Sequence, residues 1–168
     1  ILGVSWKTYL LHSSALNFLF TLITYRFLIK EGLNSNYSFF YSFLISILAY
    51  PSIGSPFSDH HALIISLIGV YILIFAIKSN KNIFWFSLPI IFFLAFLCKQ
   101  TPSGFFIILV FLIIFLNAFQ SKNYSMFFPL IFSSVITLIV MTLFLLVNKI
   151  GIKNFLVQYI YFPITIGS

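Results

Sequence analysis

The stretch SMFFPLIFSSVITLIVMTLFLLV, Ser125–Val147, decides the fold of this chain. It contains no Asp, Glu, Lys, Arg or His, and it is longer than the roughly 20 apolar residues that a helix needs to cross a bilayer. A strand that crosses a membrane is about half as long and alternates apolar with polar residues, which this stretch does not do. The stretch therefore predicts a membrane-spanning helix.

Five more apolar runs precede this one, at Thr8–Ile29, Tyr37–Ile53, His61–Ile77, Ile83–Cys98 and Ser103–Phe119. Each is expected to be a helix, because lipid offers no hydrogen-bond partner to an open backbone. The tail, Ile150–Ser168, mixes aromatic and polar residues, which favours a short helix in the membrane interface over the start of a seventh span. The fold class expected is all-α: a polytopic transmembrane helical bundle with about six spans and a C-terminal interfacial helix.

The composition agrees with an integral membrane protein, because 61% of the 168 residues are hydrophobic and 7% are charged. The net charge of +7 comes from basic residues scattered singly between the apolar runs. They form no patch, so membrane lipids are expected as partners and nucleic acid is not. The chain opens at Ile1 without Met. We expect residues 1–168 to be a single transmembrane domain and an internal fragment of a longer protein.

Alternation of six spans divides the basic residues between the two membrane faces. One side receives Lys7, Lys99, Lys149 and Lys153, and the other receives Arg26, Lys30, Lys78, Lys81 and Lys122. Because cytoplasmic loops carry the excess of Lys and Arg, the side with the larger number is expected to be cytoplasmic. Residues 51–60 contain no Lys or Arg and are then on the outer side.

Asp59 is the only Asp in the sequence, and it lies between two apolar runs in the segment Ser58-Asp59-His60-His61. One interpretation is structural: Ser58 or Asp59 caps the helix that follows, and the carboxylate favours the positive end of its dipole. The other is functional: the carboxylate binds a metal or a polar substrate at the membrane surface. The two interpretations are compatible.

The histidines offer a second set of polar groups. His60 and His61 are adjacent, so on a helix they point about 100° apart and at most one of them can join Asp59 in a site. This spacing is not a zinc signature. His12 begins the first span and, by alternation, is near the same face as Asp59. Each of the three is also consistent with an ordinary interfacial histidine.

Lys99-Gln100 lies in a very short link between two spans, followed by Thr101-Pro102-Ser103. A Lys at the end of a span usually extends its amine to the interface. Here, however, Pro102 suits a first helical turn and Thr101 or Ser103 suits a cap. A Lys beside a helix N-terminus is a plausible phosphate clamp, because both supply positive potential.

Several catalytic signatures are absent from the sequence. It has no phosphate-binding Gly-rich loop, no Cys/His metal spacing and no nucleophile elbow. Glu31, the other acid, is expected on the face opposite Asp59. If the protein is an enzyme, at least one catalytic acid or base is therefore expected outside this chain.

Two motifs carry a resemblance to a known family. SDHHAL, Ser58–Leu63, opens a helix that runs to Lys78, and LCKQTPSG, Leu97–Gly104, follows one hairpin later. They resemble the GT-C superfamily of membrane glycosyltransferases, in the group that includes protein O-mannosyltransferases and lipid A aminoarabinose transferases. The opening GVSWK, with a span ending near Arg26, looks like the second helix of that family, and the tail Phe155–Ser168 looks like a segment that follows the helical core in some bacterial members.

The resemblance implies an enzyme that transfers a sugar from a polyprenyl-phosphate carrier to a lipid, glycan or protein on the outer face of a bacterial inner (plasma) membrane. Asp59 matches a later acidic position of the family, and Lys99 matches a basic residue suited to the carrier's phosphate. His60, His61, Gln100 and His12 are expected to bind substrate. Some members bind a divalent metal, for which Asp59 is the candidate ligand. The family's usual catalytic base lies in a first outer loop that would precede Ile1.

The rival interpretation is a fragment of a membrane transporter or lipid flippase without transferase activity. Such proteins place polar residues along a pathway through the bilayer. In this sequence the interiors of the predicted spans contain almost no ionisable groups, which favours an enzyme acting at one face.

Overall fold

We describe a computed structural model of the chain, which covers residues 5–49, 58–162 and 165. Every regular element in these residues is helical, and no strand occurs among them. The elements are α1 (Trp6–Lys30), α2 (Ser35–Leu48), α3 (Ser58–Ser79), α4 (Asn82–Cys98), α5 (Gln100–Ser121), α6 (Phe127–Val147), α7 (Ile152–Leu156) and the π-helical turn η1 (Val157–Tyr161). The all-α class predicted from the sequence is confirmed.

Three of these helices, α3, α5 and α6, are long and apolar enough to cross a membrane. Such helices indicate a membrane protein. α4 is equally apolar in character but has 17 residues, and α2 has 14. α1 is long enough, but serine, threonine and asparagine interrupt its apolar residues.

Local sequence explains where the first two helices begin and end. The side chain of Ser5 accepts a hydrogen bond from the Thr8 amide and so caps α1. The chain leaves α1 through Gly32 at a φ of 97°, a left-handed conformation that glycine adopts without a steric penalty. Asn34 then accepts a hydrogen bond from the Tyr37 amide at 2.9 Å and caps α2.

The observed boundaries differ from most of the predicted runs, and α3, for example, begins at Ser58 and not at His61. α5 begins at Gln100 and not at Ser103, because a single residue, Lys99, separates it from α4. α6 begins at Phe127, two residues after the predicted Ser125. α2 ends at Leu48, and residues 50–53 of the predicted second run lie outside the described residues.

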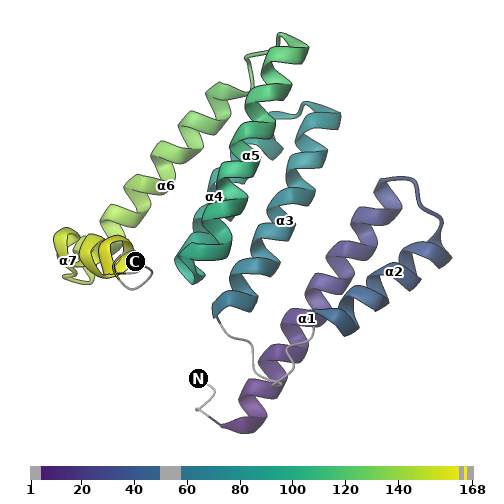
Figure 1. Cartoon of the computed structure of the whole chain (residues 1–168), viewed down its shortest axis with the longest axis horizontal. Helices are drawn as coiled ribbons and strands as arrows, with labels where there is room; N and C mark the ends of the chain where they lie inside the picture. Colours follow the sequence, from purple (N-terminus) through teal and green to yellow (C-terminus); the bar gives the residue numbers. More distant parts are fainter. Residues whose placement is uncertain (1–4, 50–57, 163–164, 166–168) are drawn as a thin grey trace.

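Successive helices run in alternate directions, so their ends gather at two levels (Figure 1). α4 packs against α3, α5 and α6, while α1 packs against α2 and, less extensively, against α3. The starts of α3 and α5 lie at one level with the end of α4 and with α7, while α1 begins beyond this level (Figure 1). This shared level brings together the sequence segments that contain Asp59 and Lys99.

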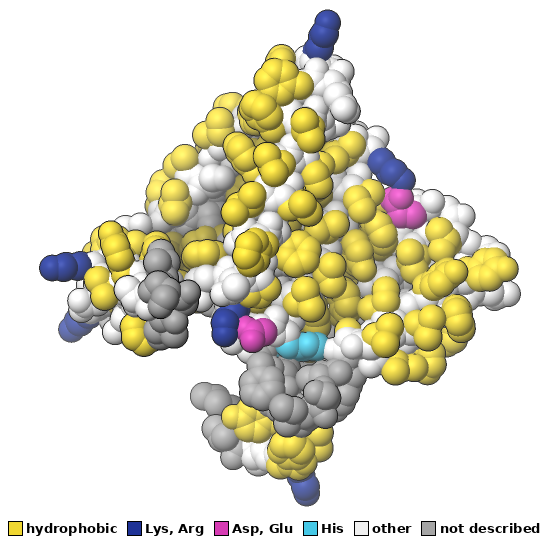
Figure 2. All heavy atoms as spheres, viewed as in Figure 1, with side chains coloured by type: hydrophobic (Ala, Val, Ile, Leu, Met, Phe, Trp, Pro, Cys, Tyr) yellow, Lys and Arg dark blue, Asp and Glu magenta, His cyan; other side chains and the backbone are white. Residues whose placement is uncertain are grey.

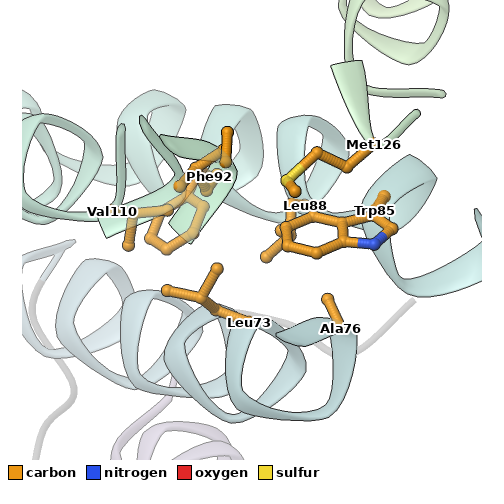
Figure 3. Packing of buried hydrophobic residues seen from close by; sticks show 9 residues of the cluster. Leu73, Ala76, Trp85, Leu88, Phe92, Val110 and Met126 are labelled. Atoms are coloured by element: carbon orange, nitrogen blue, oxygen red, sulfur yellow. The ribbon is translucent and has the colours of Figure 1, made fainter. Parts of the chain in front are cut away.

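The buried apolar core lies between α3, α4 and α5 and is closed by Met126 (Figure 3). In it, Phe92 lies near Leu73 and Val110, while Trp85 packs near Leu88, Ala76 and Met126 (Figure 3). The Trp85 indole donates a hydrogen bond to Asn80 in the α3–α4 link. On the face that Figure 2 shows, apolar side chains cover most of the helices and charged side chains lie toward the helix ends.

Candidate functional site

An ion pair joins two distant segments of the chain. Lys99 Nζ lies 3.1 Å from Asp59 Oδ1, which connects the first turn of α3 to the residue between α4 and α5. Both side chains are accessible, at 42% for Lys99 and 64% for Asp59. A pair this exposed contributes at most about 1 kcal/mol to stability. It is therefore weak enough for an incoming anion to displace the carboxylate from the amine.

Helix ends explain the position of each partner. Asp59 is the acidic residue in the first turn of α3, where the helix dipole favours a negative charge. Lys99 has an extended backbone, with a φ of −159°. It is at once the C-cap residue of α4 and the N-cap residue of α5. Thr101 or Ser103 was expected to suit the cap of α5, but both lie inside the helix, which already begins at Gln100.

Small buried residues underlie this end of α3, α4 and α5. Ala62 and Ser66 on α3, Ala95 on α4 and Ser103 on α5 are all completely buried. Small side chains allow helices to approach closely without large residues between them, as is common where helices pack in membranes. The ion pair thus lies at the end of the helices that packs through small residues. The large core residues lie further along the same helices.

The histidines divide between two environments. His61 Nε2 lies 2.8 Å from His12 Nε2, and the two rings are stacked with centroids 5.1 Å apart. One nitrogen must donate and the other accept, so this contact joins α1 to α3. The Nε2 of His60, by contrast, is buried without a hydrogen-bond partner in the described part of the chain. Figure 2 shows histidine beside one of the two acid–base pairs.

Gln100 holds the C-terminal tail against the α4–α5 junction. Its side-chain amide donates a hydrogen bond of 3.1 Å to the backbone carbonyl of Tyr159 in η1. The Tyr159 hydroxyl in turn donates to the carbonyl of Leu97, the second residue before Lys99. Burial, with a smaller contribution from Cys98, raises the pKa of Tyr159, which keeps the hydroxyl protonated as this donor requires. The sequence marked Tyr159 only as one aromatic residue of the tail.

An apolar groove of about 510 Å³ begins beside this junction. α4, α6 and the tail form its walls, and its lining includes Leu97, Phe144, Phe155 and Tyr159. Leu97 and Tyr159 are also the residues hydrogen-bonded beside Gln100. The groove therefore lies next to the polar end of the molecule where Lys99 and Asp59 meet.

The described residues do not fit a divalent metal at Asp59. No three His, Cys, Asp or Glu side chains gather closely enough among them to hold an ion. Asp59 is paired with Lys99, and His12 and His61 contact each other.

Searches of protein-family models, curated proteins and solved structures give no match for this chain.

Proposed function

We propose that this protein is a glycosyltransferase of the GT-C type, which transfers a sugar from a polyprenyl-phosphate carrier to a lipid, glycan or protein acceptor. In this proposal α1–α6 cross the membrane as a six-span bundle, and α7 with η1 lies in the interface. The alternating helix directions and the charged residues at helix ends support that topology. The larger number of Lys and Arg at the level of Lys78 and Lys122 supports a site on the outer face of a bacterial inner membrane.

The observation that carries the proposal is the Asp59–Lys99 pair beside the apolar groove. A polyprenyl-phosphate sugar combines a long apolar prenyl chain with a phosphate. The protein offers a complementary group to each of these two parts. The groove accommodates the apolar chain, and Lys99, 42% exposed, presents its amine to the phosphate. The backbone N–H groups at the start of α5 add positive potential beside Lys99.

The proposed reaction is a direct displacement at the anomeric carbon. The acceptor's nucleophilic oxygen or nitrogen forms a bond to that carbon while the bond from carbon to the carrier's phosphate oxygen breaks. The lipid phosphate leaves with the electron pair, and the acceptor's proton passes to a general base that we assign to none of the described residues. Lys99 stabilises the negative charge that develops on the phosphate.

The other site residues have supporting roles in this proposal. When phosphate takes the place of Asp59 beside Lys99, the carboxylate becomes available to orient the acceptor. His60 offers a buried ring nitrogen for a hydrogen bond, and His61 is held near this end by His12. Gln100 fixes the tail that forms one wall of the groove.

A transporter or flippase is the alternative function, and the distribution of charge does not favour it. The described Lys, Arg, Asp and Glu side chains lie in links or within about a turn of a helix end. A carrier that moves a polar substrate across the bilayer usually places such groups near the midplane.

Consumption of donor by the full-length protein tests the proposal. Purified protein in lipid nanodiscs is incubated with polyprenyl-phosphate sugars that differ in their sugar and with a bacterial envelope extract that supplies lipid, glycan and protein acceptors, and released polyprenyl phosphate is measured. Lys99→Ala is expected to slow release about 100-fold, since removal of one group that stabilises a developing anion has an effect of this size. Lys122→Ala, at the opposite level, is expected to retain the wild-type rate. Full activity of Lys99→Ala would remove the role given to Lys99.

A further inference from the structure

A second groove, with polar residues in its lining, runs between α1 and α2. Its volume is about 600 Å³, which is within the range of small-molecule sites. Hydroxyl or amide groups along it come from Ser14, Asn17, Thr21, Tyr25, Ser42 and Ser46. Phe18, Phe39 and Phe43 also line it and are each more than half exposed. The groove therefore combines an apolar, accessible rim with several hydrogen-bonding groups.

Asn17 supplies an unused hydrogen-bond acceptor at this groove. The residue is 93% buried, with 7% of its surface exposed. Its Nδ2 donates to the Ser46 carbonyl at 2.8 Å and contacts the Ser46 hydroxyl at 3.2 Å. A carbonyl can only accept, so the amide nitrogen must face it and Oδ1 must face away. Oδ1 is buried and has no hydrogen-bond partner among the described residues.

A buried amide oxygen without a partner is unfavourable, and a ligand that donates a hydrogen bond would satisfy it. Among the described residues that line the groove there is no Lys, Arg, Asp or Glu, so a phosphate or ammonium headgroup would find no opposite charge there. With α1 crossing the bilayer as proposed above, Asn17 lies about 16 Å from the start of that helix, at a rise of about 1.5 Å per residue. An uncharged hydroxyl can reach this depth far more easily than a charged headgroup can.

We propose that the groove between α1 and α2 binds an uncharged lipid alcohol from the bilayer. In this proposal the Asn17 amide turns its Oδ1 toward the groove to accept a hydrogen bond from the hydroxyl, and the hydrocarbon chain lies against Phe18, Phe39 and Phe43. A transmembrane helix of a partner is the less favoured occupant. The backbone amides of such a helix are already hydrogen-bonded within the helix, so it would need a polar side chain at the depth of Asn17 to donate to Oδ1.

Photolabelling of the full-length protein in nanodiscs tests this site. The probe is a C16 alkanol with a diazirine in its chain, and the control is its methyl ether, which has the same chain but no donor. Labelling of peptides from α1 and α2 is quantified by mass spectrometry. The alcohol is expected to label them roughly fivefold more than the ether, as expected for one net hydrogen bond. Equal labelling by the two probes would overturn the proposal, and this comparison requires no variant.

Asn17→Leu identifies the acceptor. This variant is expected to reduce labelling by the alcohol to the level of the ether, while Asn117→Leu on α5, away from the groove, is expected to leave it unchanged. Preferential labelling that persists in Asn17→Leu would contradict the role of Asn17. Crosslinking of the groove to another polypeptide in place of the probe would likewise overturn a lipid occupant. Sugar transfer is measured separately, so the two proposals can fail independently.

Discussion

Asp59 Oδ1 and Lys99 Nζ lie 3.1 Å apart at the N-terminal end of α3. At the opposite end of the same helix, Lys78 pairs with Glu31, which follows α1. Each end of α3 is thus joined by an ion pair to a different neighbour, the α4–α5 junction at one end and the α1–α2 turn at the other. Since Asp59 and Glu31 are the only two acids of the sequence, the whole acidic content of the chain is used at the ends of this one helix.

Neutralising Asp59 is expected to affect function far more than stability. Asp59→Asn keeps the size of the side chain but removes its charge. Because both partners are exposed, the free energy of unfolding in detergent should change by less than about 1 kcal/mol. Donor consumption should fall at least tenfold if the carboxylate orients the acceptor. Lys78→Met, which breaks the opposite ion pair, is the control and should leave donor consumption unchanged. Equal losses of activity in the two variants would indicate a purely structural role for Asp59.

Gly69 is expected to tolerate no side chain. A Cβ at this position of α3 would lie 2.6 Å from Phe92 Cζ, and Phe92 is a buried core residue that has little room to move. Gly69→Ala should therefore lower the free energy of unfolding by about 1–3 kcal/mol. Gly104→Ala on α5 is the matched control, because nothing lies within 4 Å of its added methyl group. Higher helix propensity should make that variant neutral or slightly stabilising. Equal effects of the two substitutions on thermal unfolding would contradict this packing.

The sequence predicted the helical elements well because long apolar helices leave a strong signal in composition. It could not predict that His12 on α1 would lie against His61 on α3. The periodicity of one helix does not determine which side chain of another helix packs against it. The expected position of α5 was wrong by three residues because a single extended residue, Lys99, is enough to turn the chain after α4. The predicted runs had left residues 99–102 as a very short link, with Thr101 or Ser103 as the cap.

The Asp59–Lys99 contact could be anticipated only in part. Alternation of the predicted spans placed both residues on one face of the membrane. It could not predict the 3.1 Å distance between them, because this distance depends on how α3 and α4 pack through small residues. The contribution of Tyr159 could not be foreseen. Its carbonyl and hydroxyl contact Gln100 and Leu97 through a fold of the tail that no local pattern encodes.

The His12–His61 contact is expected to help hold α1 against α3. His12→Leu removes the hydrogen-bonding nitrogen and should lower the free energy of unfolding by about 0.5–1.5 kcal/mol. His12→Gln retains a group that can donate or accept and should lose less. Thermal unfolding of the two variants in the same detergent compares them directly. A Gln variant as unstable as the Leu variant would show that the contact depends on ring stacking and not on the hydrogen bond.

The tail is expected to loosen when its contact with α4 is removed. Tyr159→Phe deletes the hydroxyl that donates to Leu97, and the amides of residues 152–161 should exchange roughly fivefold faster with deuterium. Tyr161→Phe changes an exposed side chain and serves as the control. Exchange that is equally fast in both variants would contradict the role of Tyr159 as an anchor of the tail.

A single outer site requires that positions on both sides of the Asp59–Lys99 pair be accessible from outside the cell. Single cysteines at Ser58, Thr101, Asn80 and Asn123, in a Cys98→Ser background of the full-length protein, can be treated with a membrane-impermeant maleimide on intact cells. We expect positions 58 and 101 to be labelled from outside, and positions 80 and 123 only after the membrane is opened. Labelling of 58 and 101 from opposite sides would contradict a shared site.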